Sequence, residues 1–530
     1  MKNISNKQFM MFLAVLVGLS VGLGAFVIKK LVHLIQYLLT QGFSTHYQNY
    51  LLLLYPAVGI LLVVLFIKFV LRQHVGHGIP SVLYAISKTN GIIKRHNMFS
   101  SVITSALTVG FGGSVGLEGP TVATGAAIGS NIGRFFRLNY KQIILLLGCA
   151  CAGAMASIFK APIAAIVFAL EVIMLDLTMA SLLPLLLASV TAALTSYLLM
   201  GQNVLYPVKV EGSFYIMDVP FFIMLGIFTG FISVYFTRVY MFVNKLFDSM
   251  KKWYVKLAIG GTTLGLLIFL LPSLYGEGYE VINTCLNGNF DYLYNNSVFY
   301  SLRDNFGIIL LLFVMVLLLK VVATSITFGS GGIGGIFAPS LFLGSSAGLF
   351  FAKVCKYVGA DINEKHFALV GMAGLIAGVI HAPLTAIFLI AEITGGYQLF
   401  MPLMITATIS YATVKVFESN SVYTIQLAKR GELMTHDKDK AVLSMLKVDK
   451  LIETNFKTVG PDKKLRDLVD VISKSTRNIY PVVDDDNTLL GIVFLDHIRH
   501  IMFRQEMYDT IYVRDLMFMP SPLIHPDESM

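Results

Sequence analysis

The sequence predicts an α-helical polytopic membrane protein made of two related halves with broken helices, followed by a small α/β domain. Of its 530 residues, 56% are hydrophobic and only 13% are charged, and the mean hydropathy is +0.73. This composition is typical of chains that cross a membrane several times. Two blocks of sequence recur in the same order and at nearly the same offset, and the composition becomes charged after Leu427.

The predicted membrane helices follow one another along most of the chain. Residues 9–39 and 51–71 are apolar segments that we expect to be full-length helices, since a span takes about 20 residues. The N-terminal apolar run continues beyond the length of a signal peptide, so we expect it to be the first span. Further apolar segments begin at Met98, Ile143, Pro162 and Met179 and cover 219–246, 257–271 and 308–417. Their glycines and prolines predict short, broken helices, which are expected where non-helical backbone lines a buried site.

The repeated blocks predict two homologous halves, residues 30–200 and 219–417. The segment that begins with Gly119-Pro120 matches the segment that begins with Ala338-Pro339, and residues 161–171 match residues 382–392. Paired halves with broken helices in corresponding places indicate a site at their interface. The offset of the first block puts Phe337 opposite Glu118.

Glu118 is the candidate functional residue, because it is a carboxylate inside the apolar segment FGGSVGLEGPTVATGAAIGS, residues 111–130. Ionisable groups at membrane depth are costly and by default indicate a functional site. The neighbouring Gly119 and Pro120 predict a turn and the start of a helix, whose free N–H groups and positive dipole end attract anions. A carboxylate there competes with a bound anion until it is protonated. The alternative is that Glu118 caps a helix in a polar contact between helices.

Four motifs together carry a family resemblance. GHGIP (residues 76–80), GLEGP (116–120), GGIFAP (334–339) and a late tyrosine, Tyr423, occur in the order found in the CLC family of chloride channels and chloride/proton exchangers, which the chain resembles over residues 1–428. The resemblance implies the CLC fold of two inverted repeats. It also implies a homodimer in which each subunit has its own anion pathway.

The resemblance further implies roles for individual residues. Glu118 would be the external gate and the proton-binding group, Ile336 and Phe337 would offer backbone N–H groups to the central anion, and Tyr423 would offer its hydroxyl. Backbone amides replace part of an anion's hydration without a full positive charge, so the ion can leave quickly. The other expected anion-binding positions are His77, Gly78, Ile79, Gly116, Leu117, Gly119 and Ala338. For Tyr423 the alternative is an interfacial aromatic at the end of a span.

Two residues depart from the family pattern. His77 stands where the family commonly has a serine that faces the central ion, so the anion preference and pH dependence are expected to differ unless His77 turns away. Val172 stands where many exchangers have an inner glutamate, and valine cannot relay a proton. The preceding Glu171 has a repeat mate, Glu392, which favours a structural role for both. These residues favour passive conduction, although His77 or a chain of water molecules could substitute in an exchanger.

The tail after the membrane region resembles a CBS domain. We expect a linker at residues 429–445, a CBS domain at 446–505, whose core strands are YPVVD (480–484) and GIV (491–493), and the start of a truncated second repeat at 510–530. The second repeat is expected because the pattern between Val448 and Leu465 recurs between Val513 and Met530. Phe494 and His497 occupy places where such domains use polar residues to hold adenine nucleotides, so we expect a module that stabilises a dimer or couples to the gate.

The leading functional hypothesis is transport of chloride or a similar small anion through a passive channel gated by voltage or pH, and we expect no enzyme activity. A chloride/proton antiporter is the close alternative, and a membrane sensor acting through the tail is a distant one. Glu118 has no catalytic partner motif such as HExxH or GxSxG. The net charge of +9 is attributed to basic loops beside membrane spans and not to nucleic-acid binding. We expect no cofactor besides chloride as bound substrate, and a location in the plasma membrane with the tail in the cytoplasm.

Overall fold

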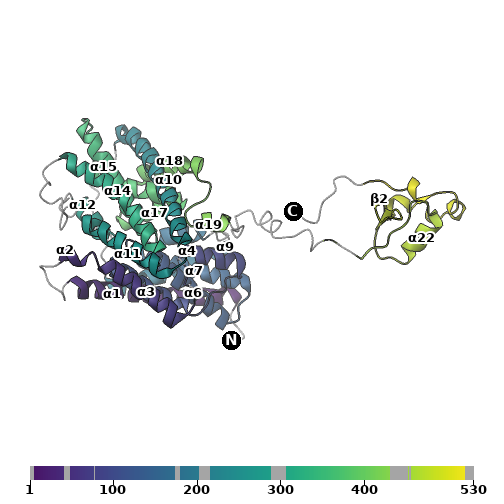
Figure 1. Ribbon diagram of the computed structural model, residues 1–530, viewed down its shortest axis with the longest axis horizontal. Coiled ribbons are helices and arrows are strands. Elements are labelled where there is room, and N and C mark those ends of the chain that lie inside the picture. The colour runs from purple at the N-terminus through teal and green to yellow at the C-terminus, as the bar shows by residue number, and fades with distance from the viewer. Residues whose placement is uncertain are drawn as a thin grey trace. The chain divides into compact units, whose positions relative to one another are not determined.

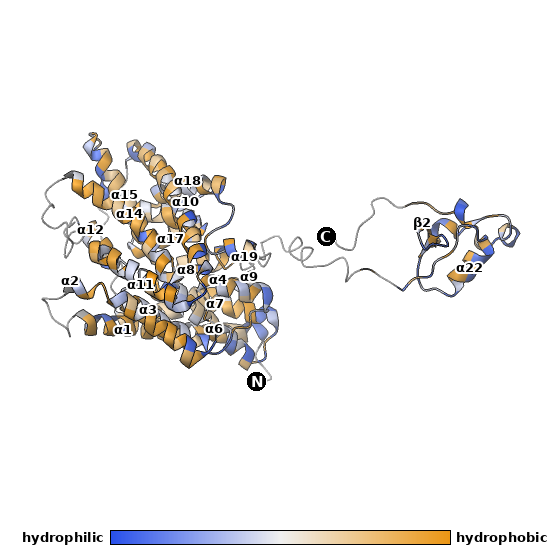
Figure 2. Cartoon of the chain, in the orientation of Figure 1, coloured by the Kyte–Doolittle hydropathy of each residue, from blue (hydrophilic) through white to orange (hydrophobic). Residues whose placement is uncertain are grey.

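The computed structural model describes residues 5–40, 48–73, 75–76, 78–173, 179–201, 215–287, 306–429, 452 and 455–519. The chain divides into two compact units, Met1–Leu433 and Met434–Met530 (Figure 1). In the described part of the chain, eight helices are long and apolar enough to cross a membrane. Most residues of the helices in the first unit are hydrophobic, as their orange colour in Figure 2 shows. The predicted polytopic membrane fold is therefore confirmed.

The first half of the membrane unit contains both long and short helices. Its helices are α1 (Asn6–Thr40), α2 (Gln48–Leu51), α3 (Tyr55–Leu65) with a π-helical end η1 (Phe66–Leu71), α4 (Ile79–Lys88), α5 (Asn97–Gly110), α6 (Glu118–Phe135), α7 (Tyr140–Phe159), α8 (Pro162–Glu171) and α9 (Met179–Met200). The structure corrects the predicted start of the second apolar helix. The helix predicted to begin at residue 51 begins at Tyr55, because a turn intervenes and Pro56 favours a helix start.

The second half likewise contains both long and short helices. Its helices are η2 (Ile216–Asp218), α10 (Val219–Ser249), α11 (Trp253–Leu270), η3 (Pro272–Leu274), α12 (Tyr279–Leu286), α14 (Phe306–Gly329), α15 (Phe337–Tyr357), α16 (Glu364–Ile380), α17 (Pro383–Ile393), α18 (Phe400–Phe417) and α19 (Ile425–Lys429). Glu118 and Phe337, which correspond in the two repeats, each begin a helix, as the offset predicts.

Reciprocal hydrogen bonds relate the two halves. The N–H of Ile333 donates to Oγ1 of Thr108 at 3.0 Å, and the N–H of Ser114 donates to Oγ1 of Thr327 at 3.2 Å. The two threonines occupy corresponding positions of the repeat, and so do the two amides. Such an exchange requires two similar loops that face each other across a pseudo-two-fold axis. The two halves that repeat in the sequence are therefore also related by symmetry in the fold.

A second exchange involves the paired glutamates. The carboxylate of Glu392 accepts the N–H groups of Ile163 at 3.1 Å and Ala164 at 2.7 Å, at the start of α8. The carboxylate of Glu171 accepts the N–H groups of Leu384 at 3.2 Å and Thr385 at 2.8 Å, at the start of α17. Each glutamate thus satisfies free donors in the first turn of the other half's helix, a favourable place for negative charge.

The second unit contains a two-stranded antiparallel sheet of β1 (Ile479–Val483) and β2 (Leu489–Phe494), with α22 (Leu465–Ser473) and α23 (Leu495–Ile498). Leu465, Tyr480 and Val493 lie in its hydrophobic core. Residues 511–518, within the stretch expected to open a second repeat, pair with this unit. The N–H of Ile492 donates to the carbonyl of Phe518 at 2.9 Å, and the N–H of Phe518 donates to the carbonyl of Ile492 at 3.1 Å.

Candidate anion site at three helix starts

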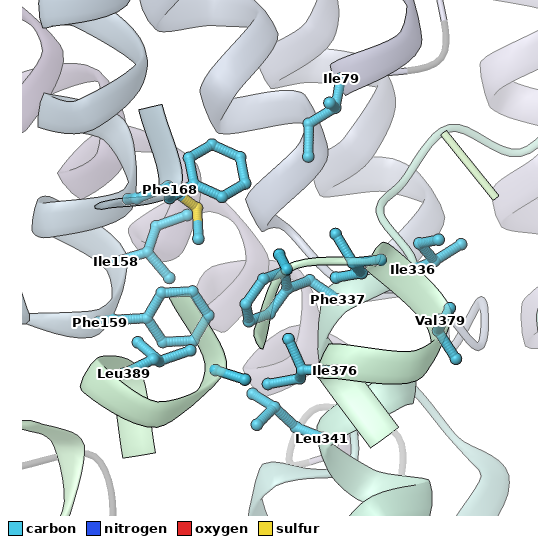
Figure 3. Packing of buried hydrophobic residues seen from close by; sticks show 14 of the residues in the cluster. Ile79, Ile158, Phe159, Phe168, Ile336, Phe337, Leu341, Ile376, Val379 and Leu389 are labelled. Atoms are coloured by element: carbon cyan, nitrogen blue, oxygen red, sulfur yellow. The ribbon is translucent and has the colours of Figure 1, made fainter. Parts of the chain in front are cut away.

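Three helix N-termini meet in the membrane unit, those of α4, α6 and α15. Gly78 precedes α4 with a φ of 56°, and a Cβ atom built on it would lie 3.0 Å from the Cα of Gly119 in the first turn of α6. A Cβ on Gly119 would in turn lie 3.1 Å from the Cα of Gly335, just before α15. The glycines therefore allow the three backbones to approach closely. Figure 3 labels Ile79 and Phe337, the first residues of α4 and α15, and Ile336, which directly precedes α15.

Gly116 and Gly335 join the two halves at this point. The N–H of Gly116 donates to the carbonyl of Gly335, and the N–H of Gly335 donates to the carbonyl of Gly116, each at 2.8 Å. This short antiparallel bridge fixes the direction of the two segments that lead into α6 and α15. Helix starts from both halves are thereby held at one place.

The carboxylate of Glu118 lies beside this bridge. The side chain is fully buried, and its Oε1 accepts a hydrogen bond from the hydroxyl of Tyr279. Its Oε2 has no hydrogen-bond partner in the described part of the chain, although the backbone N–H groups of Glu118 and Ala338 act on the carboxylate from nearby. A Cβ atom on Gly116 would overlap Oε2, so a larger residue there would displace the carboxylate from this position. Backbone groups from the starts of α6 and α15 therefore surround the carboxylate.

Free backbone donors lie at the start of α15. Among the described residues, the N–H groups of Ile336 and Phe337 find no acceptor. Both side chains are buried, and the ring of Phe337 packs against that of Phe159 with centroids 5.2 Å apart (Figure 3). First-turn N–H groups without an acceptor, together with the helix dipole, form a partially positive end suited to an anion.

Tyr423 is buried in the turn that precedes α19. Its side chain is 5% exposed, and its hydroxyl has no hydrogen-bond partner within the described ranges. The hydroxyl lies close enough to Glu118 for the two groups to interact electrostatically. A buried hydroxyl is normally satisfied, so this donor is available to a bound ion. Leu117 is also buried near this site, and its N–H already donates to the carboxylate of Glu277. His77 lies outside the described residues.

The inner position of the expected proton route is apolar. Val172 is 6% exposed and belongs to the hydrophobic core of the membrane unit. The adjacent Glu171 is committed to the first turn of α17, where it also accepts the hydroxyl of Thr385 at 2.7 Å. The hydrogen bonds of Glu171 are those of a helix-capping residue.

Sequence reasoning missed four polar residues near Glu118. Tyr279 donates to Glu118, and Glu277 accepts the N–H of Leu117 at 3.2 Å. Lys320 is fully buried in α14, and Lys29 is partly buried in α1. Two signals could have found them. Glu277 is flanked by glycines as Glu118 is, and Lys320 is a lone charge in a long apolar run.

The sequence pattern of the family described as "Voltage gated chloride channel" matches residues 59–415, which include all three helix starts and Glu118. The chain belongs to this family, the CLC family. A second pattern, that of the CBS domain, matches residues 448–504.

Named relatives and a solved structure agree with this assignment. A ClcB-like chloride channel protein of Ralstonia nicotianae is 30% identical over 387 residues, which cover 72% of this chain and 86% of the relative. An H(+)/Cl(-) exchange transporter, ClcA of Vibrio cholerae, is 28% identical over 78% of this chain and 88% of its own length. The crystal structure of a slow cyanobacterial Cl-/H+ antiporter matches with a TM-score of 0.68 at 24% identity, covering 81% of this chain and 99% of that one.

Membership establishes the general activity. CLC proteins are anion channels and transporters, not enzymes, and this chain is a multi-pass membrane protein that carries anions across a membrane. Its relatives include proteins named as channels and proteins named as exchangers.

The CBS unit places aromatic rings at the two positions considered for nucleotide contacts. The rings of Phe494 and His497 lie 5.4 Å apart, and both contact the ring of Phe518, at 5.4 Å and 5.5 Å. These positions thus pack against the pairing segment 511–518.

Proposed function

We propose that this CLC protein conducts chloride or a similar small anion through the junction of α4, α6 and α15, and that Glu118 is its gate. The observation that carries the proposal is the position of the Glu118 carboxylate, which is fully buried beside backbone donors from both halves. A tethered carboxylate in such a place competes directly with a free anion.

Protonation opens the pathway in this proposal. When Glu118 binds a proton, it loses its attraction to the helix starts, and an anion takes its place. The N–H groups of Ile336 and Phe337 and the hydroxyl of Tyr423 then replace part of the hydration of the ion. Because these groups carry partial charges only, the ion is not held so tightly that it cannot leave. The remaining proposed contacts are those of Gly78, Ile79, Gly119 and Ala338, together with His77. Gly116 and Leu117 were also expected to bind the anion, but their N–H groups already donate to the carbonyl of Gly335 and the carboxylate of Glu277.

Passive conduction is favoured by the inner end of the pathway. An exchanger needs a second proton carrier, and Val172 is buried among apolar side chains while Glu171 caps α17. Chloride/proton exchange is the second candidate, since the Vibrio cholerae relative is named as an exchanger. We also propose a homodimer in the plasma membrane, with one pathway in each subunit and the CBS unit in the cytoplasm.

Flux in proteoliposomes tests the mechanism. Purified protein is reconstituted with a chloride gradient, and chloride efflux and proton uptake are recorded together. We expect chloride efflux that rises as the pH falls, without stoichiometric proton movement against the proton gradient. Stoichiometric proton uptake driven by chloride would replace the channel by an exchanger. Absence of chloride flux from folded protein at any pH would overturn the proposal.

A further inference from the structure

Residues 274–279 run beside the loop that leads into α6. Oγ of Ser114 donates to the carbonyl of Leu274 at 2.7 Å, and the N–H of Leu117 donates to the carboxylate of Glu277 at 3.2 Å. The two bonds are three residues apart on both strands of chain, so the segment and the loop run in the same direction. This pairing sets how far along the loop the segment lies.

Lys320 of α14 ties the segment to the membrane helices. Its side chain is fully buried, and its Nζ donates to the carbonyls of Leu274 at 3.2 Å and Gly276 at 3.0 Å. The Nζ atom also lies 4.9 Å from the centroid of the Phe342 ring in α15. Because a buried amine and buried carbonyls have no water to bond to instead, breaking these hydrogen bonds is costly. The two carbonyls are therefore held in place.

The segment ends at Tyr279, whose hydroxyl donates to the gate carboxylate. Tyr279 is only three residues beyond the nearer carbonyl that Lys320 holds. Between them, Gly278 has a φ of 88°, and a Cβ atom on it would come within 2.5 Å of the ring of Phe342. The chain from the held carbonyl to Tyr279 is thus short and closely packed, so a displacement of the carbonyl is passed on to the hydroxyl.

The ionisable groups around the Glu118 carboxylate come from several elements. They are Tyr279 of α12, Glu277 before α12, Lys29 of α1 and Tyr423 before α19. In the described part of the chain, the hydrogen bond to the carboxylate oxygen comes from Tyr279. The hydrogen bonds of Lys320 within the same ranges go to the two carbonyls and not to Glu118.

We propose that Lys320 is a positioning residue for the gate, which places the Tyr279 hydroxyl on the Glu118 carboxylate by holding the carbonyls of residues 274 and 276. The inference rests on the proposed function of Glu118. The side-chain nitrogen of a lysine donates to carbonyls with or without its third proton, so the effect does not depend on charge. When the segment is released, the hydroxyl no longer stabilises the ionised carboxylate, which then binds a proton at higher pH.

The test is the pH profile of chloride efflux from proteoliposomes between pH 4 and pH 8. In Lys320→Met, which keeps a long side chain without donors, we expect the midpoint of activation to rise by up to about one pH unit, the shift that follows loss of one hydrogen bond to a charged oxygen. Ser325→Ala is the matched control, because Ser325 is a buried donor of the same helix that bonds within it, to the carbonyl of Val321 at 2.7 Å. Tyr275→Phe leaves both carbonyls held. Both controls should keep the wild-type midpoint.

A double variant separates positioning from any other effect of Lys320. In Tyr279→Phe the hydroxyl is already absent, so adding Lys320→Met to it should cause no further shift, whereas independent effects would add. Additive shifts would overturn the inference. A folded Lys320→Met protein with the wild-type midpoint would overturn it as well.

Ser114→Ala takes the place of Lys320→Met if size-exclusion chromatography shows that the lysine variant does not fold. The Ser114 hydroxyl is an uncharged tie to one of the same carbonyls, so its loss should raise the midpoint, by less and only while Tyr279 is present. An unchanged midpoint would again contradict the inference. Failure of the proposed function is recognised separately in Glu118→Gln. That variant should lose its pH dependence, and a profile that keeps the wild-type pH dependence would remove Glu118 itself as the gate.

Discussion

The hydroxyl of Tyr279 donates a hydrogen bond to Oε1 of Glu118, so a residue at the start of α12 holds the carboxylate at the start of α6. The two residues belong to different halves of the membrane unit. Glu118 is therefore restrained by a partner in addition to the backbone around it. A gate of this kind has a closed position that single substitutions can weaken or strengthen.

Tyr279→Phe should open the gate at a higher pH than in the wild type. The change removes a donor to an ionised oxygen, and such hydrogen bonds contribute roughly 1.5–3 kcal/mol. Since about 1.4 kcal/mol corresponds to one pH unit, the midpoint of chloride efflux should rise by about one unit. Tyr275→Phe is the control, because the Tyr275 hydroxyl donates to the carbonyl of Gly110 in the same region. An unchanged midpoint in Tyr279→Phe would show that the hydrogen bond does not hold the closed gate.

Tyr423→Phe should weaken chloride binding while leaving the fold intact. Its hydroxyl makes no hydrogen bond to the described part of the protein, so the substitution leaves no group there without its partner. A typical net hydrogen bond contributes about 1 kcal/mol, which predicts chloride affinity about fivefold lower by titration calorimetry. Equal affinity in Tyr423→Phe and wild type would exclude the hydroxyl as an ion contact.

Glu171→Ala and Glu392→Ala should each lower the free energy of unfolding by about 2 kcal/mol, because each removes a charged acceptor from two first-turn N–H groups. Thermal unfolding in detergent measures the effect. Glu418→Ala is the control. Glu418 pairs with Arg238 at 2.9 Å, but the arginine side chain is 62% exposed, and such ion pairs contribute little. If Glu171→Ala unfolds at the wild-type temperature but alters proton movement, Glu171 belongs to a proton route.

The sequence predicted those parts of the site that depend on local backbone chemistry. Gly119 and Pro120 predicted that a helix begins beside Glu118, and α6 begins there. The offset between the repeated blocks predicted its counterpart at Phe337, where α15 begins. Glycine, proline and internal repetition are visible in a single sequence because they act on neighbouring residues or on a copied pattern.

The partners of Glu118 could not be predicted in the same way. Tyr279 lies far from Glu118 along the chain, and its segment 275–305 is polar enough to be taken for a loop. Pairing between such distant side chains depends on how α12 and α14 pack in the folded unit. The suggested influence of His77 on anion preference stays a prediction, since this residue lies outside the described ranges.

The central claim is that the Glu118 carboxylate occupies an anion-binding position, and a bromide-soaked crystal of Glu118→Ala tests it most directly. Anomalous scattering locates bromide, which replaces chloride. We predict a bromide peak in the space left by the carboxylate, beside Gly116 and Gly335 and within reach of the N–H groups of Ile336, Phe337 and Ala338. A well-ordered crystal with no bromide at the junction of α4, α6 and α15 would contradict the account.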